Sequence, residues 1–109
     1  MSARRLGPGA TIATLRHRIE AVDRRLIDLY ADRRRLVEAL WEYKHGKGLP
    51  LEDPRQEARI VARARDWAVA RGLPPDEAER FIRGVVGECK RAMLTLFPSP
   101  LSLHSTTEA

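Results

Sequence analysis

The feature that most constrains this chain is a stretch from residue 11 to residue 45 with neither glycine nor proline. Apolar residues recur in it at steps of three and four: Ile12, Leu15, Ile19, Val22, Leu26, Leu29, Leu36, Leu40 and Tyr43. This spacing predicts a helix. Over about 12–45 it would be about 50 Å long, whereas a compact domain of this size is only about 30–35 Å across. We therefore expect the apolar stripe to be buried against a second copy of the chain, in a homodimer.

Two shorter helices are predicted from the remaining glycines and prolines. Residues 55–71 follow Asp53 and Pro54, a good N-cap and a favoured first helical residue, and stop at Gly72. Residues 76–97 follow a second proline-rich break and end before Pro98. The sequence thus predicts an all-α fold with three helices per chain, one of them very long, and no strands.

The positions of glycine and proline also predict how the chain is divided into segments. Residues 1–10 are expected to form a flexible N-terminal arm, residues 11–97 one helical domain, and the Ser/Thr/Pro-rich residues 98–109 a disordered tail.

Charge and cysteine content narrow the class of partner. Lys and Arg number 20 against 15 Asp and Glu, and the net charge of +5 favours an anionic partner. Aromatic residues make up only 6% and acids interrupt the arginines, which favours a small anionic metabolite over nucleic acid. The single cysteine, Cys89, excludes an internal disulfide or a multi-thiolate zinc site. We expect a cytoplasmic protein with no metal, secretion signal or membrane helix.

Charged residues occupy or border the apolar stripe of the long helix. Arg33 falls on the heptad row that runs from Ile12 to Leu40, where an arginine is costly unless an anion meets it. Arg16 and Lys44 border the same face but lie about 40 Å apart along one helix. In an antiparallel dimer, Arg16 of one chain would approach Arg33 and Lys44 of the other. The pattern therefore predicts a shared cationic pocket, one per chain.

Structural interpretations stand beside these functional ones. The Arg33 side chain can extend along the helix and reach solvent with its charged end. Its neighbours Arg34 and Arg35 are expected on a solvated face. Lys44 lies near the C-terminal end of the helix, where positively charged residues are common.

Acidic and sulfur-containing residues elsewhere have structural interpretations too. Asp53 and Glu57 share a helix face, but a helix cap explains Asp53 and a surface position explains Glu57. Cys89 and Met93 lie on an apolar stripe, which predicts that they belong to the core.

Three segments together carry a family resemblance: LRHRIEAVDRRLIDLYADRRRLVEALWEYK, LEDPRQEARI and GLPPDEAERFIRGVVGECKRAM. They contain Arg16, Asp23, Arg33, Lys44 and the spacing Asp53-Pro54-x-x-Glu57. Over about residues 12–95 the chain resembles the all-α chorismate mutases. The resemblance implies an intertwined helical homodimer with shared active sites. It also implies a [3,3] rearrangement of chorismate to prephenate that needs no cofactor.

The resemblance further implies roles for individual residues. Arg16 from one chain and Arg33 from the other would hold the two carboxylates of the substrate, and Lys44 would donate to the ether oxygen as its C–O bond breaks. Asp53 and Glu57 would bind the substituent at ring carbon 4. Arg33 and Lys44 are thus the predicted catalytic residues.

Three further predicted substrate-binding positions depart from the usual family pattern. Gln56 stands where the family has arginine, Met93 where it has a second donor to the ether oxygen, and Cys89 where serine is frequent. Because methionine cannot donate a hydrogen bond, we expect weakened activity on chorismate. A neutral Gln56 beside two acids favours an ammonium at carbon 4. The preferred prediction is therefore an isomerase that converts 4-amino-4-deoxychorismate to 4-amino-4-deoxyprephenate in an antibiotic or other secondary-metabolite pathway.

Three alternatives stay open at this point. The first is a chorismate mutase acting on chorismate itself. The second is an isochorismate-pyruvate lyase, which the same fold hosts. The third is a non-enzymatic helical dimer that binds nucleic acid through its basic surface, with a steep dependence on salt.

Overall fold

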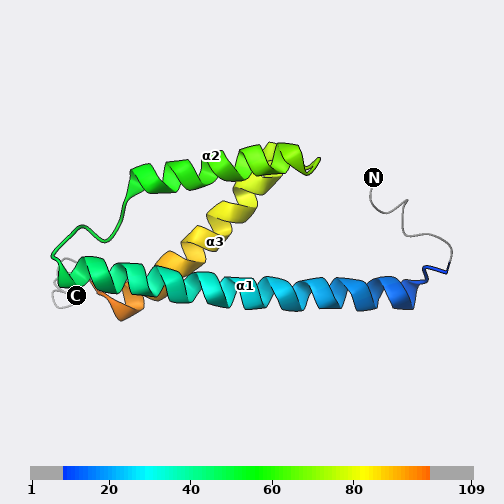
Figure 1. Ribbon diagram of the computed structural model, residues 1–109, viewed down its shortest axis with the longest axis horizontal. Coiled ribbons are helices and arrows are strands. Elements are labelled where there is room, and N and C mark those ends of the chain that lie inside the picture. Colours follow the sequence, from blue (N-terminus) through cyan, green and yellow to red (C-terminus); the bar gives the residue numbers. More distant parts are fainter. Residues whose placement is uncertain (1–8, 99–109) are drawn as a thin grey trace, which may run out of the picture. The chain divides into compact units, whose positions relative to one another are not determined.

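The computed structural model describes residues 9–98, and its helices are α1 (Ile12–Gly46), α2 (Pro54–Ala70) and α3 (Pro75–Leu96) (Figure 1). The described residues contain no strand. The predicted all-α fold with one very long helix is therefore confirmed. The predicted N-terminal arm and C-terminal tail lie almost entirely outside the described residues. No helix within 9–98 is long and apolar enough to cross a bilayer.

The chain divides into two compact units, Met1–Arg33 and Arg34–Ala109, with the boundary inside α1. The described part of the first unit is the N-terminal portion of α1. The second unit contains the C-terminal portion of α1 together with α2 and α3.

The first unit begins with a reciprocal cap that the sequence reasoning missed. The Thr11 hydroxyl accepts a hydrogen bond from the Thr14 backbone N–H at 3.1 Å, and the Thr14 hydroxyl accepts one from the Thr11 N–H at 2.7 Å. Two backbone donors that a helix start leaves unpaired are thereby satisfied, with threonine in the place usually taken by Glu or Gln.

Apolar side chains of the first unit face solvent. Ile12, Ile19, Val22, Leu26 and Leu29 are each between 46% and 69% exposed. A single helical segment cannot bury its own stripe, because burial needs a second apolar surface.

The second unit buries its core chiefly between α2 and α3. Ala64 and Ala68 of α2 and Cys89 and Met93 of α3 are buried, and small alanines allow close approach of the two helices. Trp41 near the end of α1 is also buried. The centroid of its ring lies 6.2 Å from that of Phe97, and the two ring planes are tilted relative to each other.

A tight turn joins α2 to α3. Gly72 takes a positive φ of 74°, which glycine adopts without steric cost, and the Leu73 N–H returns to the Ala68 carbonyl at 2.9 Å. Pro75 then occupies the first turn of α3, where its missing N–H costs nothing. The predicted stop at Gly72 is confirmed.

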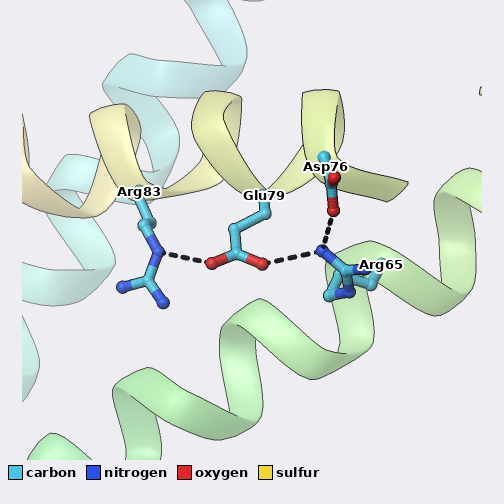
Figure 2. A network of polar contacts seen from close by, with 4 residues as sticks. All are labelled: Arg65, Asp76, Glu79 and Arg83. Carbon is cyan, nitrogen blue, oxygen red and sulfur yellow. Dashed lines mark hydrogen bonds and ion pairs between the residues drawn. The ribbon is translucent and has the colours of Figure 1, made fainter. Parts of the chain in front are cut away.

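Four charged residues connect the two helices beside this turn (Figure 2). Arg65 of α2 reaches Asp76 at 2.7 Å and Glu79 at 2.8 Å, and Glu79 also pairs with Arg83 at 2.8 Å. The hydrogen bonds from Arg83 and Arg65 hold the pKa of Glu79 below its ordinary value. Within this network the two contacts of Arg65 join α2 to α3, whereas the pair of Glu79 and Arg83 lies within α3.

Candidate functional site

Arg16 and Arg33, the two predicted carboxylate-binding arginines, belong to the first unit. Arg16 is exposed, whereas Arg33 is half-buried. The neighbouring Arg34 and Arg35 are exposed, as the sequence predicted for a solvated face. Arg33 is therefore less exposed than its neighbours in this run, and less exposed than Ile19 and Leu26 on the same heptad row, which are 59% and 46% exposed.

Lys44 lies in the last turn of α1, within the second unit. Its side chain is half-buried, and Nζ donates to the Leu51 carbonyl at 3.5 Å. The backbone carbonyl of Lys44 accepts from the Leu49 N–H at 2.9 Å. The ammonium thus contacts the loop that leads into α2. Because an ammonium has three N–H donors and this contact uses one, donors remain for a further partner.

Asp53 and Gln56 form the start of α2. The Asp53 carboxylate accepts from the Gln56 backbone N–H at 3.2 Å, which confirms the predicted N-cap. The Gln56 side chain accepts from Arg59 Nε at 3.0 Å. The spacing Asp53-x-x-Gln56 also suits a capping box, in which the Gln56 side chain would accept from the Asp53 backbone N–H. In the structure this side-chain oxygen accepts from Arg59 instead.

Glu57, one turn into α2, meets a cation that the sequence reasoning did not single out. Lys90 of α3 lies with Nζ 2.8 Å from Glu57 Oε2 and 3.2 Å from Glu52 Oε1. The hydrogen bond to Glu57, reinforced by Glu52, raises the pKa of Lys90 above its ordinary value. Lys90 is therefore charged throughout the physiological pH range, and the negative charge of Glu57 is compensated by a residue of the same chain.

A sequence signal for Lys90 existed. It stands between the apolar residues Val86 and Leu94, four positions away on either side, and so interrupts an apolar row of α3 just as Arg33 interrupts that of α1. An open groove of about 210 Å³ runs beside it between α2 and α3, with Glu57 and Val61 on one side and Lys90 and Leu94 on the other.

Cys89 and Met93 lie one turn apart on α3 and are the most buried side chains described, at 2% and 0% exposure. This burial agrees with the core positions that the apolar stripe predicts. Their role in substrate binding stays a prediction.

The second unit thus brings together Asp53, Gln56 and Glu57 at the start of α2, with Lys90 of α3 against Glu57. Lys44 is tied to the loop before them. Among residues 9–98, no group of three or more His, Cys, Asp or Glu is arranged to hold a metal ion. Lys44 and Lys90 supply ammonium donors here, and Asp53 and Glu57 supply carboxylate acceptors.

Comparison with known proteins matches most of this chain to one family. The family model described as chorismate mutase type II matches residues 15–93. The chain is 42% identical over 79 residues to the T-protein of Enterobacter agglomerans, which covers 72% of this chain and 21% of that protein. It is 35% identical over 74 residues to the T-protein of Haemophilus influenzae, covering 68% of this chain and 20% of that protein. The chain therefore spans about a fifth of the length of these curated relatives. No solved structure matches it.

Proposed function

Because this chain belongs to the chorismate mutase type II family, a family of isomerases, we propose that it rearranges chorismate to prephenate. The observation that carries the proposal is the extent of the family match. It runs over residues 15–93 and so includes every residue predicted to touch the substrate, from Arg16 to Met93.

The proposed mechanism needs no covalent intermediate, proton transfer or cofactor. Arg16 and Arg33 bind the two substrate carboxylates and select the compact conformer in which the reacting carbons approach each other. Lys44 donates to the ether oxygen, on which negative charge develops as the C–O bond breaks. A half-buried ammonium is suited to this because reduced hydration strengthens its interaction with the oxygen.

We propose that Arg16 comes from one protomer and Arg33 and Lys44 from the other, in a homodimer. The support is the exposed stripe of α1, in which Ile19, Leu26 and Leu29 are 59%, 46% and 62% exposed. A second copy of the same stripe is the complementary occupant, because a two-fold interface pairs like surfaces. A cytoplasmic location, which suits a chain with one cysteine, belongs to the same proposal.

A second candidate substrate is 4-amino-4-deoxychorismate, which would place the enzyme in an antibiotic or other secondary-metabolite pathway. One observation favours it. The neutral Gln56 stands beside three acids at the start of α2: Glu52, Asp53 and Glu57. These carboxylates would attract an ammonium at carbon 4 wherever no nearby cation compensates them.

Product analysis tests the proposal directly. The purified protein is incubated separately with chorismate, isochorismate and 4-amino-4-deoxychorismate, and each product is identified by chromatography and mass spectrometry. We expect prephenate from chorismate. Salicylate and pyruvate from isochorismate would instead identify a lyase. Absence of all products, together with salt-sensitive retention on nucleic acid, would support the non-enzymatic alternative.

A further inference from the structure

The pair formed by Glu57 and Lys90 has a consequence for substrate choice, which rests on the function proposed above. Glu57 is proposed, together with Asp53, to meet the carbon-4 substituent. Its Oε2 is 2.8 Å from Lys90 Nζ, and the two side chains are 36% and 30% exposed. Partial burial limits screening by water and salt, so the charge of Lys90 is felt by any group that binds Glu57.

The carboxylate of Glu57 retains capacity for a neutral ligand. An ionised carboxylate offers about four lone-pair sites, and Lys90 takes one of them. A substrate hydroxyl can donate to the remaining sites without any change in net charge. A substrate ammonium bound there would lie within about 6 Å of the Lys90 ammonium, where like charges repel.

Lys90 also changes how the substitution at Gln56 is interpreted. In the family pattern an arginine precedes the glutamate on α2, and here that position is neutral. Lys90 provides a positive charge against the same glutamate from α3, and its second contact, 3.2 Å to Glu52, compensates a further acid. The cation missing from one helix is thus present on the other.

We propose that Lys90 is a specificity-determining residue that acts through Glu57 to favour a hydroxyl over an ammonium at carbon 4 of the substrate. The acidic cluster beside Gln56 therefore does not select the amino substrate while Lys90 is in place.

The test compares kcat/KM for chorismate and 4-amino-4-deoxychorismate in the parent and in Lys90→Gln. The parent is expected to prefer chorismate. Lys90→Gln is expected to move the ratio about tenfold toward the amino substrate, as a partly screened charge pair would. Lys90→Arg retains the cation and should keep the ratio within about twofold of the parent value.

Arg91→Gln is the matched control. It removes one positive charge from the next residue of α3, where the side chain pairs with Glu88 rather than Glu57. The substrate ratio of this variant should equal that of the parent, which separates a local effect on Glu57 from a change in overall charge. Thermal melts of all variants verify folding, and a purely structural role for Lys90 would lower activity on both substrates without changing their ratio.

Distinct outcomes overturn the two proposals. A parent that prefers the amino substrate, or an unchanged ratio in Lys90→Gln, overturns the role of Lys90 while leaving the mutase function in place. If the parent binds both compounds by calorimetry but turns over neither, the mutase function is overturned. The role of Lys90 is then tested by the ratio of the two Kd values, which Lys90→Gln should move toward the amino compound. A parent that binds neither overturns both.

Discussion

At the scale of single residues, Arg33 and Lys44 are proposed to carry different parts of the same reaction. Arg33 is half-buried on a heptad row, which suits a group that binds a carboxylate before and during the rearrangement. Lys44 is proposed to face an oxygen that becomes charged only in the transition state, so its contribution is made mainly to kcat.

Alanine substitutions separate these contributions. Lys44→Ala should lower kcat by about 10²–10³-fold with little change in KM, because it removes a donor to developing charge. Arg33→Ala should raise KM as well as lower kcat, because a carboxylate loses its partner in both states. Steady-state kinetics on chorismate provide the measurement.

Arg34→Ala is the control for these variants, because Arg34 is the exposed neighbour of Arg33. Its kcat/KM should stay within about twofold of the parent value, as surface substitutions usually have small effects. Equal losses in Arg33→Ala and Arg34→Ala would contradict the assignment of Arg33 to the site.

At the scale of elements, the polar network between α2 and α3 makes stability depend on pH. Arg83 and Arg65 lower the pKa of Glu79 in the folded chain relative to the unfolded chain. The carboxylate therefore stabilises the fold above its unfolded pKa, and this stabilisation is lost as the pH falls through the lower, folded pKa.

Glu79→Gln should reveal this contribution. The difference in Tm between the parent and Glu79→Gln should be largest near pH 7 and should shrink as the pH is lowered toward 3, because the parent then loses its ionised carboxylate too. Asp66→Asn, which alters an exposed acid of α2, should show a smaller and flatter difference. Equal pH profiles for the two variants would mean that the network contributes nothing specific.

At the scale of the whole molecule, the exposed stripe of α1 predicts assembly. Light scattering at micromolar protein should give the mass of a dimer. Leu26→Glu should raise the dimer Kd by about 100-fold or more and abolish activity, since two charges would replace the leucines that the proposed symmetric interface buries.

His17→Glu tests whether this effect is specific to the stripe. It introduces the same charge into the exposed opposite face of α1 and should leave the dimer mass unchanged. A parent chain that is an active monomer would contradict the dimer and the shared site together.

The sequence by itself determined the helices and their ends. Periodic apolar residues, the Asp53 cap, the Gly72 stop and the proline after it act over one or two turns, so their effects are visible in the order of residues alone. The family followed from the resemblance of three sequence segments to known proteins, and the family match over residues 15–93 confirms it. The resemblance also supplied the candidate roles of most site residues, whereas spacing alone singled out Arg16, Arg33 and Lys44.

Only the tertiary structure decided which charges meet. Lys90 and Glu57 lie 33 positions apart, and their contact depends on how α3 packs against α2 around Ala64, Ala68, Cys89 and Met93. The acids at the start of α2 suggested an uncompensated negative cluster, but packing brings a lysine from another helix against two of them. The reason is physical: helix periodicity is a short-range property of the chain, whereas the electrostatic environment of a side chain is set by whatever the fold places within a few ångströms of it.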